Sequence, residues 1–219
     1  EQKVDSSAFN SSSNAFFVMS LAPFMQQTVF VIIAGFYLSD TDLGLFKAAE
    51  KLALTISFIL IVVNAVLPPQ FARLYQLGKI EKLASLARKG ALCGLLFASP
   101  LLILCFIFPK FLLGFFGAEF LEAAPLLRII TLAQAINVAT GSVGFLLNMS
   151  GHEKLMRNIS LGSNALGLVV LLTCAPLHGV CSAAWAIFII VITQNIFACY
   201  YASKKLNFYI IPVDLISKK

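Results

Sequence analysis

The chain has 219 residues, of which 59% are hydrophobic and only 12% are charged, and its formal net charge is +6. Soluble domains carry about 25% charged residues, so this composition excludes an ordinary water-soluble domain. Every charged side chain avoids five long stretches, which are residues 6–39, 52–72, 90–109, 129–152 and 158–203. Each stretch is at least as long as the ~20 residues that a helix needs to cross a bilayer, and the last has room for two crossings.

These stretches predict helices and not a membrane β-barrel. Barrel strands alternate apolar and polar residues, whereas residues 58–63 read FILIVV without alternation. We therefore predict an all-α integral membrane protein with a six-helix transmembrane bundle over residues 16–203. Residues 1–15 are polar and rich in Ser and Asn, and we interpret them as a leader or interdomain linker of a chain that is incomplete at its N-terminus.

The first half of the bundle is expected to hold three spans, at about residues 16–38, 52–67 and 90–109. The second span should stop at Pro68-Pro69, because proline removes a backbone donor and clashes with the preceding turn. Residues 70–89, which carry five basic residues and one Glu, are then predicted to form a basic amphipathic linker.

The second half is expected to begin with a connector, residues 110–128, that contains a short amphipathic helix. Three further spans follow at about residues 129–149, 156–175 and 180–203. They are separated by a tight loop at residues 150–154 and a turn at residues 176–179 that contains Pro and Gly. Residues 204–219 form a basic tail.

The charges also predict an orientation. With six spans, residues 68–89, 150–157 and 204–219 share one face and carry +4, +1 and +3. The loops of the other face sum to −1. The positive-inside rule therefore predicts that both termini are cytoplasmic. On this interpretation the basic residues signal topology, and we expect no nucleic-acid partner.

Polar residues inside the spans are the first candidates for a binding site. Span four carries Gln134, Asn137, Gly141, Gly144 and Asn148 at spacings of three and four, which predicts one face of one helix. Span five repeats the pattern around Asn164. Amides are costly toward lipid, so these residues either pack against other helices, as polar residues do in membrane bundles, or line a wet cavity.

Few residues are candidates for catalysis, metal binding or anion binding. The sequence holds no enzyme signature and no cluster of metal ligands, so we expect neither an enzyme nor a bound metal or other cofactor. Lys51 and Arg128 stand at predicted span ends. They are suited to hold an anionic head group, or alternatively they extend to the membrane surface as long basic side chains commonly do.

Two segments resemble motifs of a transporter family. Residues 116–128 read FGAEFLEAAPLLR and residues 44–52 read GLFKAAEKL. Both are similar to motifs of the Wzx-type flippases for O-antigen and other polysaccharides, in the multidrug/oligosaccharidyl-lipid/polysaccharide exporter superfamily. Residues 147–151 (LNMSG) and 179–184 (GVCSAA) resemble later motifs of that family, although Ser182 replaces a glycine.

The resemblance implies a fold and a function. Such flippases have two six-helix bundles around a central cavity, and this chain corresponds to the C-terminal half. They move an undecaprenyl-pyrophosphate-linked oligosaccharide across the bacterial inner membrane by alternating access. The implied partners are the lipid-linked oligosaccharide, membrane lipid and the missing N-terminal half. The candidate substrate-binding residues are then Lys51, Arg128, Gln134, Asn137, Asn148 and Asn164.

Two alternatives stay open at this point. One is a cation-coupled antiporter of multidrug or small-molecule type from the same superfamily, which would need a carboxylate inside a span. The uncharged stretches contain none. The other is a membrane fragment or scaffold without transport function.

Overall fold

A computed structural model describes residues 35–206, which contain helices and no strands. The elements are α2 (Asp40–Gln76), α3 (Ile80–Ile107), α4 (Pro109–Gly114), the 3-10 helix η1 (Ala118–Ala123), α5 (Ala124–Thr140), α6 (Val143–Met149), α7 (Glu153–His178) and α8 (Cys181–Leu206). The predicted leader 1–15, nearly all of the predicted first span 16–38 and the tail beyond residue 206 lie outside the described residues.

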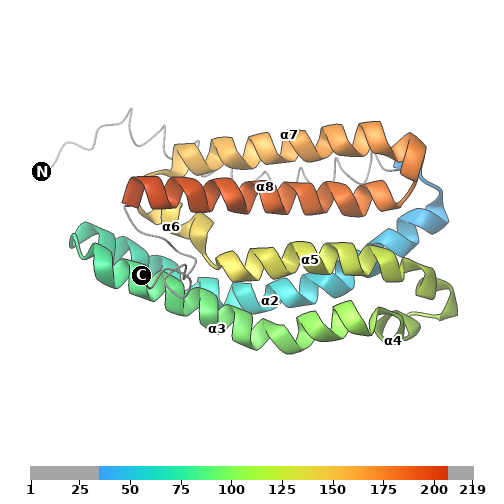
Figure 1. Ribbon diagram of the computed structural model, residues 1–219, viewed down its shortest axis with the longest axis horizontal. Helices are drawn as coiled ribbons and strands as arrows, with labels where there is room; N and C mark the ends of the chain where they lie inside the picture. The colour runs from blue at the N-terminus through green and yellow to red at the C-terminus, as the bar shows by residue number, and fades with distance from the viewer. Residues whose placement is uncertain (1–34, 207–219) are drawn as a thin grey trace, which may run out of the picture.

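The described part is an all-α bundle, as predicted. Five segments are long and apolar enough to cross a bilayer: α2, α3, the run Ala118–Thr140, α7 and α8. They lie side by side along one long axis (Figure 1). The five correspond to predicted spans two to six, and the predicted first span is not among the segments described.

The two ends of the bundle differ in charge. The α2–α3 turn, the α6–α7 loop and the last turn of α8 lie at one end, which we call the basic end (Figure 1). Residues 73–89, 153–157 and 204–205, at or next to these segments, contain nine Lys and Arg and two Glu, a net charge of +7, whereas residues 40–51 and 110–128 at the opposite end sum to −1. Residues 52–72 of α2 separate the two sets of charges by about 31 Å at 1.5 Å per residue, close to the thickness of a hydrocarbon core.

Helix α2 does not end at Pro68-Pro69, so that prediction was wrong. The helix continues to Gln76, and the predicted linker 70–89 consists of the end of α2, a short turn and the start of α3. Pro68 is buried, and its neighbours Leu67 and Phe71 belong to a hydrophobic cluster with α3 and α6. This tertiary packing outweighs the loss of backbone hydrogen bonds at the two prolines.

The predicted fourth span is also not a continuous helix. It breaks at Gly141 and Ser142 into α5 and the short α6. Gly141 has φ 63° and ψ −144°, a conformation that is essentially restricted to glycine. A Cβ atom at Gly141 would also lie 2.8 Å from the Cβ of Ala91 in α3. The break therefore depends on glycine both for its backbone angles and for the close approach of α3.

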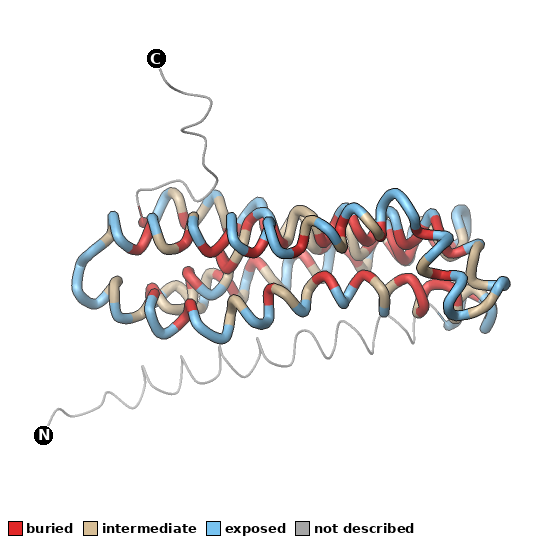
Figure 2. The backbone as a smooth tube through the Cα atoms, turned by 90° about the horizontal axis from the view of Figure 1, so that it is seen from below, coloured by how far each residue is buried: buried red, intermediate tan, exposed pale blue. Residues whose placement is uncertain are grey.

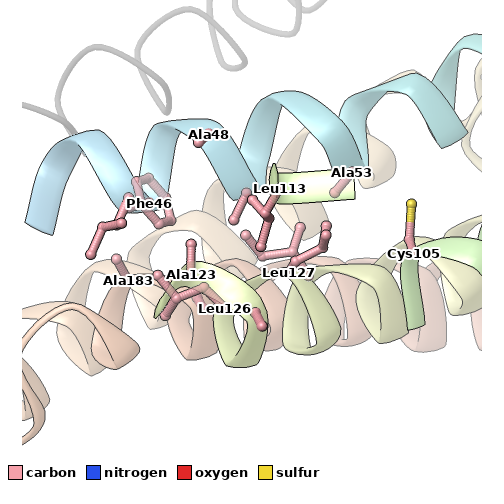
Figure 3. Close-up of a cluster of buried hydrophobic side chains, with 14 of the residues drawn as sticks. Phe46, Ala48, Ala53, Cys105, Leu113, Ala123, Leu126, Leu127 and Ala183 are labelled. Carbon is pink, nitrogen blue, oxygen red and sulfur yellow. The ribbon is translucent and has the colours of Figure 1, made fainter. Parts of the chain in front are cut away.

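The buried side chains form two hydrophobic clusters, one toward each end. Figure 2 marks the buried residues in red, and they lie along the inward-facing sides of the helices. The first cluster joins the start of α2, the end of α3, η1, α5 and the α7–α8 corner, and includes Phe46, Leu113, Leu127 and Ala183 (Figure 3). The second joins the end of α2, the start of α3, α6, the start of α7 and the end of α8. Between them, Asn64, the Gly141 break and Asn195 form a polar layer across the bundle.

The glycine requirement at the break gives a stability prediction. Gly141→Ala should lower the free energy of unfolding by about 2–4 kcal/mol, because it adds backbone strain and overpacking against Ala91. Gly162→Ala is the matched control, since Gly162 is an exposed residue of α7 with no atom within 4 Å of an added Cβ. It should be neutral or slightly stabilising. Unfolding by SDS titration from mixed micelles measures both, and equal stability of the two variants would contradict the role of Gly141.

Candidate functional site

Next to the polar layer, and sharing Asn195 with it, side chains of α2, α5 and α8 form a hydrogen-bonded network. The Ser57 hydroxyl donates to Gln134 Oε1 at 2.7 Å, and Asn137 Nδ2 donates to the same oxygen at 3.2 Å. Asn195 Nδ2 lies 3.4 Å from Asn137 Oδ1, and the Thr140 hydroxyl lies 2.6 Å from Asn195 Oδ1. We call these five residues the amide network. They tie α2, α5 and α8 to one another.

The network lies deep in the bundle. Ser57 is six residues beyond Lys51, or about 9 Å along α2, and Asn195 is nine residues before Lys204, or about 14 Å along α8. Gln134 and Asn195 are only 7% and 8% exposed. The amides therefore stand well inside the uncharged region, where an unpaired polar group is costly.

The break between α5 and α6 has its own hydrogen bonds. The Ser142 hydroxyl donates to Asn64 Oδ1 of α2 in a short contact. The Thr140 hydroxyl also lies 3.0 Å from the carbonyl oxygens of Ile136 and Asn137, which belong to the last turn of α5. A broken membrane helix frees carbonyl groups that need donors, and Thr140 offers its single proton to this group of acceptors.

A cleft of about 590 Å³ opens beside the break. Its wall is built from residues of α2, α5, α6, α7, α8 and the α5–α6 break, and it combines amides and hydroxyls with apolar side chains. The polar side chains that line it are Ser57, Asn64, Asn137, Ser142, Asn148, Ser160, Gln194 and Asn195. Met149, Met156 and Phe145 are among its apolar lining residues, and none of the described lining residues carries a charge.

The four predicted amides fall into two groups. Asn137 and Asn148 line the cleft, although they lie on different sides of the break and not on one continuous helix as predicted. Gln134 packs between α2 and α5 with its oxygen accepting two hydrogen bonds, which matches the packing alternative. Asn164 donates to Ser160 O at 2.9 Å within α7 and is not a lining residue of the cleft.

The two predicted cations are not part of the cleft. Lys51 is exposed on α2, at the end opposite the basic end, where it borders a separate groove of about 760 Å³ with Lys47, Glu50 and Thr55. Arg128 is exposed near the start of α5, and its Nε donates to Phe106 O near the end of α3 at 3.2 Å. That bond places a cation where a helix leaves carbonyls unpaired, a favourable position.

The predicted substrate-binding residues did not include six residues of the cleft. Ser160, Gln194 and Asn195 stand out in the sequence as polar residues of predicted spans five and six, whereas Ser57, Asn64 and Ser142 were missed. A signal for two of them was present, since Ser57 and Asn64 are seven residues apart in the uncharged part of α2 and so share a face. No local pattern specifies that this face meets the break after Thr140, because the contact joins residues 78 positions apart.

Comparison with known proteins adds no identification. No family model, no curated protein and no solved structure matches the chain. The geometry of the cleft is therefore the main basis for a functional proposal.

The cleft predicts a pattern of water access. Cysteine at Asn137 or Asn148 should react with a small water-soluble thiol reagent, because both positions border an open polar space. Cysteine at Leu132 should not, since Leu132 is 44% exposed on an apolar outer surface of α5, which lipid would cover. The measurement is alkylation rate in membranes, with the five native cysteines replaced by alanine. Equal protection at all three positions would show that the cleft is dry.

Proposed function

We propose that this chain is part of a transporter that moves an undecaprenyl-pyrophosphate-linked oligosaccharide across the bacterial inner membrane by alternating access, with the cleft contacting the sugar. The observation that carries the proposal is the uncharged polar cleft in the middle of the bundle. The motif resemblance at residues 44–52 and 116–128 points to the same class of substrate.

The chemistry of the cleft suits a sugar. Sugar hydroxyls both donate and accept hydrogen bonds, and Asn, Gln and Ser side chains offer both functions. Binding sites for small ligands combine a few such polar groups with apolar walls, and here Phe145, Met149 and Met156 supply apolar surface.

The basic end suits the anionic part of the same substrate. Lys154 and Arg157 lie in the first turns of α7, next to the cleft residue Met156. Positive charge at this end favours a pyrophosphate as well as the cytoplasmic orientation. A lipid-linked sugar with its pyrophosphate at the membrane surface would thus have its sugar near the α6–α7 side of the cleft.

The antiporter alternative finds less support in the described residues. A proton or cation relay inside a membrane uses carboxylates or similar ionisable groups. Glu50, the acidic residue nearest to the uncharged part of α2, pairs with Lys47 of the same helix at 2.6 Å. The cleft thus fits a neutral, hydroxyl-rich ligand better than a titrating one.

A reconstituted transport assay tests the proposal. Proteoliposomes are loaded with undecaprenyl-pyrophosphate-linked N-acetylglucosamine and exposed to external galactosyltransferase with labelled UDP-galactose, which modifies only outward-facing sugar. Functional protein should allow labelling of nearly all the lipid, whereas protein-free liposomes should stop near half.

The cleft variant in this assay is Asn148→Leu, since Asn148 lines the cleft. It should slow labelling roughly tenfold, as expected for the loss of about 1.4 kcal/mol of polar contact. Gln70→Leu, on the exposed face of α2 outside the cleft, is the matched control and should behave as the unmodified chain. Labelling that stops near half with the unmodified chain, reconstituted together with the other bundle of the proposed transporter, would exclude the proposal.

A further inference from the structure

The polar residues of the cleft differ in how their hydrogen-bonding capacity is used. Ser57 and Asn137 both donate to Oε1 of Gln134, which lies outside the cleft, and Asn195 bonds to Asn137, to Thr140 and to the backbone of its own helix at Val191 O. Asn64 and Ser142 are bonded to each other. These side chains are paired within the protein, so a ligand would have to displace protein partners to bind them.

A second group in the same cleft is not paired. Asn148 of α6, Ser160 of α7 and Gln194 of α8 all line the cleft. Their side chains make no hydrogen bond to other residues within 35–206. Asn148 Oδ1 is also buried without a donor among those residues. The three residues converge from three helices on the α6–α7–α8 side of the cleft.

An unpaired buried carbonyl is an unusual feature of a folded protein. It costs about 1–3 kcal/mol of stability, which a bound ligand with a suitable donor would recover. Because no protein hydrogen bond holds the Asn148 amide, it can rotate toward the cleft without breaking one. Gln134, with two bonds to its oxygen, cannot.

We propose that Asn148, Ser160 and Gln194 form the sugar-recognition subsite of the cleft, and that the amide network acts only to hold α2, α5 and α8 together. This inference rests on the proposed function and assigns its specificity to particular residues. The subsite binds hydroxyl groups through two amides and one hydroxyl. Met149 and Met156, from α6 and α7, cover the less polar parts of the ring.

Equilibrium binding of two lipids separates this subsite from the rest of the transporter. The full chain in nanodiscs is titrated with radiolabelled undecaprenyl-pyrophosphate-linked N-acetylglucosamine and, in parallel, with undecaprenyl pyrophosphate that carries no sugar. Asn148→Leu and Gln194→Leu should each weaken binding of the sugar-bearing lipid about tenfold. Neither variant should change binding of the sugarless lipid, and Gln70→Leu should change neither.

A second experiment uses a smaller substitution, which is less disruptive to the fold than leucine. Asn148→Cys, in the background without native cysteines, should be alkylated more slowly by a neutral water-soluble maleimide when the sugar-bearing lipid is present. The sugarless lipid should leave the rate unchanged.

The outcomes distinguish the two proposals. Three results would overturn the subsite while leaving transport possible. The Leu variants could lose affinity for both lipids equally, or bind both lipids as the unmodified chain does. Alternatively, both lipids could slow alkylation of the Asn148→Cys thiol to the same extent. Failure of the unmodified chain to bind either lipid would overturn the proposed function together with the subsite.

Discussion

The structure depends on one constraint, which is that a polar side chain in the middle of a membrane must find a partner. Helices in lipid gain little from burying apolar surface against each other, because the lipid is equally apolar. Polar contacts and close packing must hold them together instead. In this bundle Ser57, Gln134, Asn137, Thr140 and Asn195 meet that requirement and join α2, α5 and α8 between the two hydrophobic clusters.

Much of the fold was predictable, because the absence of charge over about 20 residues is a property of composition. The α7–α8 hairpin, for example, follows from a single uncharged run with Pro and Gly in its middle. The predictions at Pro68-Pro69 and at Gly141 were wrong for opposite reasons. Buried packing of Leu67 and Phe71 allows α2 to continue past its prolines. At Gly141, a close contact with Ala91 and a backbone conformation that only glycine adopts readily interrupt the predicted fourth span.

The candidate site was predictable only in part. Asn137 and Asn148 stand out in the sequence as amides within an uncharged run, and both line the cleft. The pairing of Asn64 with Ser142, or of Asn195 with Asn137, joins distant positions and follows only from the three-dimensional arrangement. Which amides are paired within the protein, as Gln134 is, and which keep free capacity, as Asn148 does, decides the functional interpretation. That distinction is a property of contacts and not of residue type.

The most direct test of this account is a double-mutant cycle between α2 and α5. Ser57→Ala, Gln134→Leu and the double variant are unfolded by SDS titration from mixed micelles, and the coupling free energy is taken from the three differences. A hydrogen bond that joins these helices predicts a coupling of about 0.6–1.7 kcal/mol, the range found for polar contacts inside membranes. Additive effects, with no coupling between the two positions, would contradict the claim that this network holds the bundle together.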